Sequence, residues 1–325
     1  LYSSHSLRRG QEKSMNIHEL NYVLCIAKHQ NMTKAAQELF ISQPTLSKHL
    51  GKLERELGIK LFSRVDNCYI PTYAGRRYME YASSVLELTH DWEKELADLR
   101  SLNDGELNVA FPLMRSSCMI PRILPAFRRI HPNIRLNFLE ETYAIQERLL
   151  TDSRIDFAIF SDGNLHPKLE YETLGREEIL LAVSPRHPLA KEAKCKVCQD
   201  GPYPKVDLSQ LGSEKFILHF PEQNTGAITE QLLKKYGIEP KVPFYTRNTQ
   251  AALLLVQQNE GICFAPETYI KNMTFSTPPV CFSLHDPDAF TRTIIAYRKG
   301  AYLTSYALDF IQISKDYFGG DLHKR

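Results

Sequence analysis

Apolar positions recur at steps of three and four residues in three short stretches near the start of the chain. This spacing is that of an amphipathic helix, in which residues three and four apart share one face. It predicts one helix over residues 17–30 and a second over 33–39, which Thr33 caps at its amino end. A third helix is predicted over residues 43–57. These stretches therefore predict three helices joined by short turns.

The third of these helices has the clearest separation of apolar and polar faces. Ser42 is placed to cap it, Pro44 is tolerated in its first turn, and Gly58 follows its last residue as a stop signal. One face carries leucines that we expect to be buried: Leu46, Leu50, Leu53 and Leu57. The opposite face carries small polar and basic residues: Gln43, Pro44, Thr45, Ser47, Lys48, Gly51, Lys52 and Arg55.

Two short β-like stretches, 60–64 and 68–71, follow the third helix around a polar tip at Asp66-Asn67. Three helices and a hairpin in this order predict a winged helix-turn-helix. The alternative for any single amphipathic helix is a solvated charged face, which is the commoner case. The ordered combination of short helix, tight turn, capped helix and hairpin favours the DNA-binding interpretation.

In a helix-turn-helix, the reading helix enters the major groove and its N-terminal residues reach the base edges. Gln43 is suited to pair with adenine, Thr45 to meet a thymine methyl group, and Lys48 to reach guanine or phosphate. Basic residues on the helices and the wing neutralise phosphates and position the reading helix. The residues predicted to contact DNA are Thr33, Lys34, Gln43, Pro44, Thr45, Ser47, Lys48, Lys52, Arg55 and Arg64.

A long helical pattern follows, from about residue 72 to residue 100. A single apolar stripe runs along it: Tyr78, Tyr81, Val85, Leu88, Trp92, Leu96 and Leu99. A stripe sustained over this length predicts a seam for a partner helix. The alternative, a helix packed only on its own domain, is weaker because the segment carries no second stripe. The polar break at 101–105 is typical of a hinge.

Beyond residue 105, strand and helix patterns alternate. The predicted strands are 107–111, 134–139, 157–160, 179–183, 216–219, 244–245, 262–264, 280–284 and 294–297. The predicted helices are 119–130, 145–150, 227–236 and 250–258. This alternation predicts α/β layers with parallel strands. The polar, proline-containing segment 185–211 is predicted to be a surface loop with short helical pieces.

The segment from Asn31 to Gly75 resembles the DNA-binding motif of LysR-type transcriptional regulators without a gap. The matching positions are Ala35-Ala36, Ser42-Gln43-Pro44-Thr45-Leu46-Ser47, Leu53-Glu54, Leu57-Gly58, Leu61-Phe62-Ser63-Arg64, Pro71-Thr72 and Ala74-Gly75. The run from Val65 to Cys68 departs from the family, which more often has a basic residue at the wing tip. The rest of the chain agrees with the family in length and in the order of its elements.

The resemblance implies a multidomain protein, with a winged helix-turn-helix at 15–72, a linker and dimerisation helix with a hinge at 73–104, and an effector-binding domain at 105–325. Residues 1–14 are interpreted as a disordered extension or an expression remnant. In the family, the long helix pairs two protomers in an antiparallel coiled coil, and dimers often assemble into tetramers. Two reading helices about one DNA turn apart require a two-fold axis and a near-palindromic site in double-stranded promoter DNA.

The resemblance further implies that the effector-binding domain resembles periplasmic binding proteins, with two α/β subdomains around a cleft. Their expected bounds are 105–181 with 266–325 for subdomain I, and 182–265 for subdomain II. In such sheets ligands bind at the carboxyl ends of strands, where helix N-termini suit an anion. The candidate effector-binding residues are Arg115, Ser116, Ser117, Thr142, His219, Thr225, Asn248 and Thr249. Helix capping is the alternative for each Ser, Thr and Asn, and a structural role is the alternative for His219.

Composition and charge restrict the picture only slightly. A chain of 325 residues, 43% hydrophobic and 24% charged, suits two or three globular domains, and its formal net charge of +2 means that any basic surface is local. No apolar run approaches the roughly 20 residues that span a bilayer, so we expect no membrane partner. The 7 cysteines, an odd number without a framework pattern, favour a reducing cytoplasm over a disulfide-stapled secreted domain.

Two cysteine features carry candidate chemistry. Cys195 and Cys198 have the spacing of half a zinc site or a redox pair, and we interpret them as ordinary thiols because no second half is evident. Cys118 lies at a predicted helix start, where the pKa of a thiol is lowered. No nucleophile–base order, phosphate-binding glycine loop or metal-ligand pair indicates an enzyme, so we expect no catalytic residue, metal or cofactor. The alternative class is an α/β ligand-binding module or enzyme with an N-terminal protein-interaction domain.

Overall fold

The computed structural model describes residues 16–66, 68–100, 104–163, 165–193, 202–212 and 214–319. The chain separates into two compact units, with the boundary between Leu96 and Ala97. The predicted extension at 1–14 lies outside the described residues, as do Cys195, Cys198 and most of the predicted hinge. The finer domain boundaries given above stay predictions.

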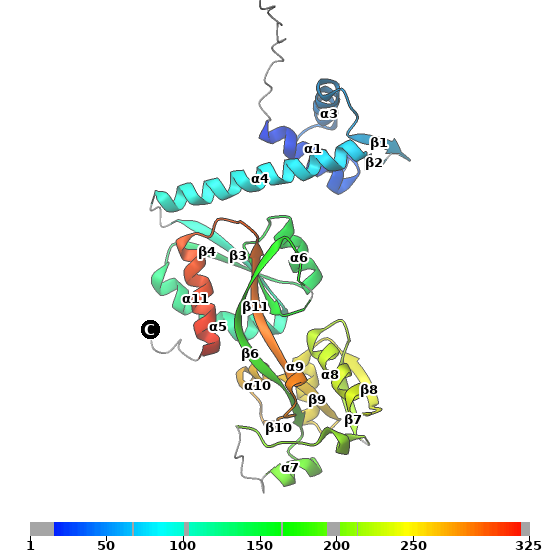
Figure 1. Cartoon of the computed structure of the whole chain (residues 1–325), viewed down its shortest axis with the longest axis vertical. Coiled ribbons are helices and arrows are strands. Elements are labelled where there is room, and N and C mark those ends of the chain that lie inside the picture. The colour runs from blue at the N-terminus through cyan, green and yellow to red at the C-terminus, as the bar shows by residue number, and fades with distance from the viewer. Residues whose placement is uncertain are drawn as a thin grey trace, which may run out of the picture. The chain divides into compact units, whose positions relative to one another are not determined.

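The first unit is a winged helix-turn-helix, as the sequence predicted. Its elements are α1 (Ile17–His29), α2 (Met32–Glu38), α3 (Gln43–Leu57), β1 (Phe62–Val65), β2 (Cys68–Pro71) and most of α4 (Tyr73–Leu99), whose last residues lie beyond the boundary (Figure 1). β1 and β2 pair antiparallel to form the wing. α3 has the predicted bounds, since the Ser42 side chain accepts the Thr45 N–H at its start and Gly58 follows its end with a left-handed φ of 70°. Both predicted end signals of α3 are therefore confirmed.

The N-cap of α2 differs from the prediction. Asn31, not Thr33, caps the helix, and its Oδ1 accepts the backbone N–H groups of Thr33 and Lys34 at 2.9 and 3.0 Å. The helix consequently begins at Met32, whose side chain is buried in the core. Asn caps helices at least as well as Thr, so both Asn31 and Thr33 are suited to the N-cap position. Burial of Met32, which lies between them, favours a helix that begins at Met32 and is capped by Asn31.

The core of the first unit is formed by α1, α2, α3 and the start of the wing. Leu46, Leu50 and Leu53 are buried in it, as the amphipathic pattern predicted. Leu57 is 41% exposed, so the prediction of its burial is wrong. It is the last residue of α3 and takes no part in the core cluster.

The start of α4 packs tightly against the wing. The Thr72 hydroxyl donates to the Lys60 carbonyl at 2.7 Å and accepts the Gly75 N–H at 3.0 Å. A Cβ on Gly75 would lie 2.0 Å from the Leu61 carbonyl oxygen, so no other residue fits without moving the helix. This close approach explains why Thr72 and Gly75 stand at these positions of the motif.

The second unit is an α/β domain whose helices and strands alternate. In chain order its elements are β3 (Gly105–Phe111), α5 (Leu113–Ile130), β4 (Ile134–Glu140), α6 (Tyr143–Thr151), β5 (Phe157–Ser161), β6 (Leu169–Val183), α7 (Pro188–Ala193), η1 (Leu208–Leu211), β7 (Lys215–His219), α8 (Asn224–Lys235), β8 (Lys241–Thr246), α9 (Thr249–Gln257), β9 (Ile262–Pro266), α10 (Glu267–Asn272), β10 (Val280–Phe282), η2 (Pro287–Ala289), β11 (Phe290–Arg298) and α11 (Ser305–Gly319). No helix within the described ranges is long and apolar enough to cross a membrane.

The strands form one mixed sheet in the order β4-β3-β5-β11-β6-β9-β7-β8, with β10 beside β6. β3 pairs in parallel with β4 and β5, and β7 pairs in parallel with β8 and β9. β6 and β11 run antiparallel to each other and to their other neighbours. The predicted parallel pairing is therefore present in each half, but it does not extend to every strand. The exceptions are the two long strands, which pass between the two halves of the unit (Figure 1).

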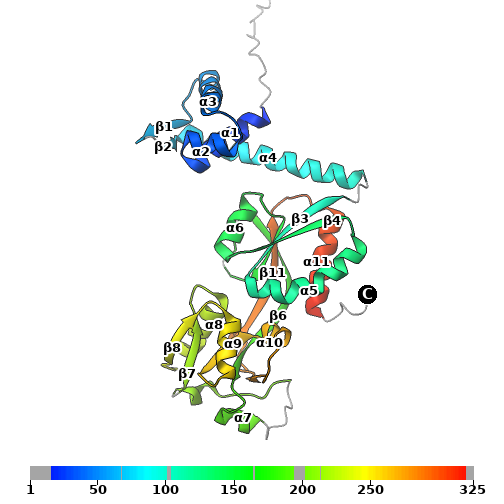
Figure 2. The ribbon, with the colours of Figure 1, turned by 180° about the vertical axis from the view of Figure 1, so that it is seen from behind.

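Each half of the second unit has helices on both faces of its sheet (Figure 2). Around β3 and β5, α5 and α11 cover one face with Phe127 and Phe310, and α6 covers the other with Leu150. Around β7 and β9, α8 covers one face with Leu232, and α9 covers the other with Leu253. The first part of β6, up to Glu178, pairs with β11. The last part, from Ile179 to Val183, pairs with β9 and β10. The predicted architecture of two α/β subdomains is thus confirmed.

Candidate functional site

The exposed face of α3 carries the residues that were predicted to read DNA. Ser47 is half-buried, and the exposed residues are Gln43, Pro44, Thr45, Lys48, Lys52 and Arg55. The Ser42 and Thr45 hydroxyls lie 2.7 Å apart and hold the first turn. Within the described part of the chain Lys48 has no ion pair, and the Lys52 ammonium lies 3.9 Å from Glu56. Exposed pairs of this kind contribute little, so both ammonium groups are able to bind phosphate.

The remaining predicted DNA contacts lie on α2 and the wing of the same unit. Thr33 and Lys34 are exposed in the first turn of α2, and Arg64 is exposed on β1. The backbone N–H groups of Thr33 and Lys34 already donate to Asn31. A phosphate at this helix end would therefore be bound through the side chains.

Glu54 connects α3 to the wing, a role that sequence reasoning missed. It is 7% exposed, and its Oε1 accepts the N–H groups of Leu61 and Phe62 at 2.9 and 3.2 Å. Its Oε2 accepts from the Lys60 ammonium at 2.6 Å. A buried carboxylate with these three donors sets the position of the wing relative to the reading helix. A charged residue on the leucine side of α3 was the sequence signal for it.

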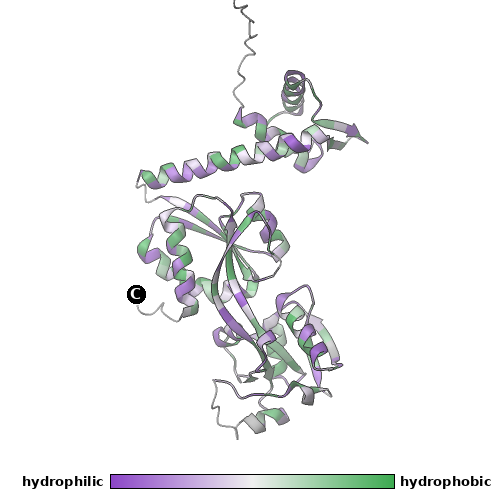
Figure 3. Ribbon diagram, viewed as in Figure 1, coloured by the Kyte–Doolittle hydropathy of each residue, from purple (hydrophilic) through white to green (hydrophobic). Residues whose placement is uncertain are grey.

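The apolar stripe of α4 is largely uncovered. Tyr81, Leu88, Trp92 and Leu99 are 60%, 69%, 54% and 68% exposed. Tyr78, at the start of the stripe, packs against the core of the first unit. Hydrophobic and hydrophilic residues alternate along the helix (Figure 3). An exposed apolar stripe of this length is suited to a second helix.

In the second unit, Arg115 is buried with a carboxylate partner. Its Nη1 lies 2.6 Å from Oε1 of Glu177, and the two side chains are 1% and 3% exposed. The guanidinium also lies 5.0 Å from the Tyr269 ring centre. Burial opposes the charge, yet Tyr269 and Glu177 raise the pKa of Arg115 above its ordinary value. The pair links α5 to β6, and the Arg115 charge is already balanced inside the protein.

The neighbouring Cys118 does not have the lowered pKa that its place near a helix start suggested. The thiol is 4% exposed, and burial raises its pKa to about 11. The lowered pKa suggested for Cys118 is therefore not found, because loss of water outweighs the nearby Arg115 charge.

The serines and threonines predicted for the effector site occupy different environments. Ser116 is buried and Ser117 is exposed, and both hydroxyls donate to the Leu113 carbonyl within α5. Thr142 is exposed at the N-cap position of α6, but its side chain makes no capping hydrogen bond. Thr225 is buried in the first turn of α8. Capping therefore explains none of the four.

His219, Asn248 and Thr249 lie together where β7 meets α9. His219 is 4% exposed, and its Nε2 lies 3.0 Å from the Thr249 hydroxyl, which is also buried. Burial lowers the pKa of His219 to about 4, so the ring is neutral at pH 7. Asn248 caps α9 by accepting the Ala251 N–H at 3.1 Å. The hydroxyl of Thr249 thus gives His219 a partner within the protein, which agrees with a structural role for this ring.

The two halves of the second unit meet at strand ends and helix starts. The Asn224 amide, in the first turn of α8, donates to the carbonyl of Asp162, directly after β5, at 3.3 Å. The Asp162 carboxylate accepts from Arg292 on β11 at 2.7 Å. Neither Asp162 nor Asn224 was predicted, although one follows a predicted strand and the other precedes Thr225. These contacts bring the carboxyl end of β5 to the amino end of α8.

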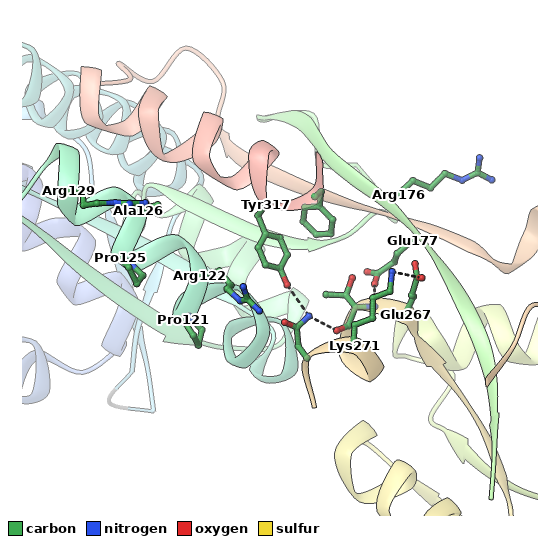
Figure 4. Close-up of a pocket in the computed structure, with 13 residues that line it drawn as sticks. Pro121, Arg122, Pro125, Ala126, Arg129, Arg176, Glu177, Glu267, Lys271 and Tyr317 are labelled. Carbon is green, nitrogen blue, oxygen red and sulfur yellow. Dashed lines mark hydrogen bonds and ion pairs between the residues drawn. The ribbon is translucent and has the colours of Figure 1, made fainter. Parts of the chain in front are cut away.

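A separate groove of about 460 Å³ runs beside α5 (Figure 4). Its lining residues come from α5, β6, α10 and α11: Pro121, Arg122, Pro125, Ala126, Arg129, Arg176, Glu177, Glu267, Thr268, Lys271, Asn272, Tyr317 and Phe318. Its two carboxylates are both paired, Glu177 with Arg115 and Glu267 with Lys271. The groove contains none of the predicted effector-binding residues.

Comparison with known proteins matches both units. Residues 17–76 match the bacterial regulatory helix-turn-helix protein, lysR family, and residues 100–319 match the LysR substrate binding domain. The chain is 30% identical over 286 residues to the HTH-type transcriptional regulator BenM of Acinetobacter baylyi, covering 87% of this chain and 90% of that protein. It is 26% identical over 310 residues to the uncharacterized HTH-type transcriptional regulator YcgK of Bacillus subtilis, covering 93% and 94%.

Solved structures agree over nearly the whole chain. Full-length BenM matches with a TM-score of 0.57 at 26% identity, covering 94% of this chain and 98% of that chain. Full-length OxyR from Pseudomonas aeruginosa, at 18% identity, shows the fold alone with a TM-score of 0.65, covering 94% and 95%. Fold and site together define a transcriptional regulator with a helix-turn-helix DNA-binding domain and an effector-binding domain. The chain belongs to the LysR family of transcriptional regulators.

Proposed function

We propose that this LysR-type regulator binds a near-palindromic promoter site through α3, as a dimer that assembles further into a tetramer. A small anionic metabolite, bound between the two halves of the second unit, changes that assembly and hence DNA binding. The observation that carries the proposal is the surface of α3. Leu46, Leu50 and Leu53 are buried on one side, while Gln43, Thr45 and Lys48 are exposed at its amino-terminal half.

The exposed residues of α3 have different roles in this proposal. Gln43 pairs with an adenine edge and Thr45 contacts a thymine methyl group, so both select sequence. Lys48, Lys52 and Arg55 bind phosphate or guanine, and Thr33, Lys34 and Arg64 hold the flanking backbone. Pro44 and Ser47 shape the surface between them. Selective contacts and phosphate contacts respond differently to salt, which makes the division testable.

The uncovered stripe of α4 supports the dimer. Tyr81, Leu88 and Trp92 are spaced for a seam along one face of the helix, and each is more than half exposed. Two copies that pair along this stripe place two α3 helices about a two-fold axis. A two-fold axis through the protein requires half-sites related by the same symmetry in the DNA.

The junction of the two halves supports the effector site. Thr142 and Asn248 are exposed at the N-cap positions of α6 and α9, and Ser117 is exposed directly after the first turn of α5. We assign them to direct contact with the anion, since helix starts present free N–H groups and a positive dipole end. The buried members of the predicted set surround the strand ends and position this site: Arg115, Ser116, His219, Thr225 and Thr249.

The test of DNA binding is fluorescence anisotropy of the full chain with DNA from upstream of its own gene, with random-sequence competitor and at two salt concentrations. Gln43→Ala is expected to cost about 1–3 kcal/mol and to relax selection at one base pair. Lys48→Ala is expected to weaken all sequences alike and to reduce the salt slope by about 1. Gln312→Ala and Lys234→Ala, exposed on α11 and α8, are the matched controls. Equal binding by the α3 variants and these controls would refute the proposed interface.

The test of effector control is the length of the footprint on the selected DNA with a panel of small carboxylic acids. An acid that shifts the thermal unfolding of the full chain is expected to change the footprint, because only a ligand that prefers one arrangement shifts the balance. Thr142→Ala should weaken that shift, whereas Thr151→Ala, at the other end of α6, should not. Acids that bind and leave every footprint unchanged would contradict effector control.

A further inference from the structure

Phe40 occupies the turn that joins α2 to α3 and is held in an unusual state. Its backbone φ is 55°, in the left-handed region, and its side chain is 96% exposed. The flanking residues Leu39 and Ile41 pack against the core of the first unit, whereas Phe40 takes no part in that cluster. The ring of Phe40 is therefore the part of the turn that projects from the protein.

The left-handed backbone follows from the way α2 ends. The Ile41 N–H donates to the Ala36 carbonyl at 3.0 Å, and the Phe40 N–H donates to the Gln37 carbonyl at 3.2 Å. This pattern places Phe40 at the position after the helix that glycine or asparagine usually occupies, because a side chain there meets its own backbone. A bulky aromatic residue at such a position is unfavourable for the fold.

Two unfavourable features, a left-handed aromatic residue and an exposed ring, meet in one residue beside the reading helix. Strained residues persist where the surrounding structure holds them in place, and they cluster at binding and catalytic sites. Phe40 lies three residues before Gln43, the first residue of α3. The partner that the proposed function brings nearest to Phe40 is therefore the set of base edges in the major groove that the amino end of α3 approaches.

The chemistry of the ring selects one group on that edge. A phenyl ring has no donor, acceptor or charge to offer a phosphate or a polar base edge. The apolar group that the bases present in the major groove is the 5-methyl group of thymine, and phenylalanine is among the side chains that pack against it. A thymine methyl group is thus the complement of an exposed phenyl ring at this place.

We propose that Phe40 packs against the 5-methyl group of one thymine in each half-site and thereby selects thymine at that position. The proposal rests on the proposed function in one respect, namely that α3 enters the major groove. It adds a base-selecting residue outside α3, distinct from the thymine contact assigned to Thr45.

The experiment replaces each thymine of the selected DNA, one at a time, by deoxyuridine, which lacks only the methyl group. Binding of the full chain is measured by anisotropy. Wild type is expected to lose about fourfold in affinity at one thymine per half-site, the factor that corresponds to one buried methyl group. Phe40→Ala is expected to bind both forms of that site equally, while still responding to deoxyuridine at the Thr45 position.

Phe40→Asn separates the DNA contact from the fold. Asparagine tolerates a left-handed backbone, so this variant is expected to raise the unfolding temperature of the first unit and yet lose the same fourfold discrimination. Tyr73→Ala is the matched control, because it removes an exposed aromatic ring at the start of α4. This variant should keep the fourfold discrimination between thymine and deoxyuridine. If Phe40 had only a structural role, its replacement would not change the difference in affinity between thymine and deoxyuridine DNA.

Two results would overturn the proposal in distinguishable ways. If Phe40→Ala keeps the wild-type profile of thymine replacements while Gln43→Ala loses affinity, α3 reads the groove and Phe40 does not contact thymine. If no replacement affects wild type and Gln43→Ala is also without effect, the proposed interface fails together with the contact at Phe40.

Discussion

The two units keep the polar side chains of their candidate sites in opposite environments. In the first unit, Gln43, Thr45 and Lys48 lie on the surface of a helix whose other side is the core. In the second, Arg115 and His219 are 1% and 4% exposed and have partners within the protein. In the first unit the residues proposed to bind DNA are therefore separate from those that form the core, because a surface side chain can change without disturbing the core. In the second unit the two sets overlap, since its polar groups at the junction also hold its elements together.

The largest effect expected from this contrast is that of Arg115→Ala. Removing the guanidinium leaves Glu177 buried without its cation, which should lower the free energy of unfolding of the second unit by about 3–5 kcal/mol. Urea denaturation of the full chain, followed by circular dichroism, measures it. The double variant Arg115→Met with Glu177→Leu should recover most of the loss, since both charges are then replaced by apolar groups. Lys48→Ala, on the surface of the first unit, should stay within about 0.5 kcal/mol of wild type.

The next effect is a dependence of stability on pH through His219. The pKa of this ring falls from 6.5 to about 4 on folding because the ring is buried. Below pH 6.5 the unfolded chain binds a proton here that the folded chain does not. The free energy of unfolding should therefore fall by about 3 kcal/mol between pH 6.5 and about 4, and no further below that from this group.

His219→Gln tests this assignment, because glutamine keeps a polar group near Thr249 and does not titrate. The difference in unfolding free energy between wild type and variant should change across that pH range and be constant above it. His285→Asn, at an exposed position with a φ of 51° that asparagine tolerates, is the control. A constant difference at every pH would show that the His219 environment does not control the slope.

The variant Glu54→Ala, whose expected effect is smaller, tests whether a polar group also stabilises the fold of the first unit. Glu54→Ala removes the acceptor of two backbone N–H groups at the start of the wing, which should cost about 1–3 kcal/mol. Thermal unfolding measures this loss. The chain has a single tryptophan, Trp92 on α4, so its fluorescence reports on the first unit. Glu56→Ala, on the surface of α3, should cost less than about 0.5 kcal/mol. Equal losses would mean that Glu54 does not hold the wing.

The smallest effect expected is a gain. Gly51 lies in the interior of α3, and an added Cβ meets no atom within 4 Å. Gly51→Ala should therefore stabilise the first unit by about 0.5–1 kcal/mol through helix propensity. The same methyl group should weaken DNA binding, since it projects between Lys48 and Lys52. Gly58→Ala, at a φ of 70°, should instead destabilise the helix end, so the two variants are expected to have opposite signs in the same unfolding assay.

Much of the first unit could be predicted because its signals are local. The cap at Ser42, the stop at Gly58 and the leucine periodicity act within a few residues, and α3 has the predicted bounds. The error at Thr33 is of the same local kind, since Asn31 and Thr33, two positions apart, are both suited to cap α2, and burial of Met32 between them favours Asn31. The DNA-reading face follows from the same periodicity.

The second unit was predicted less completely because its elements depend on distant partners. Only the end of β6 was expected, since the residues before Ile179 are mostly polar and form a strand by pairing with β11, over a hundred positions later. α11 was missed altogether, although Ala307, Phe310 and Ile311 fill the core beside β3 and β5. The direction of β6 and β11 follows no local signal, so the antiparallel pairs that they form were not predicted.

The sequence by itself determined the winged helix-turn-helix, the exposed residues of its reading helix and the family, because each depends on residue types at short spacing. Only the tertiary structure decided which polar residues of the second unit are available to a ligand. Arg115 is neutralised by Glu177, and His219 is kept uncharged beside Thr249. Burial and pKa are set by neighbours in space, and those neighbours are far apart along the chain.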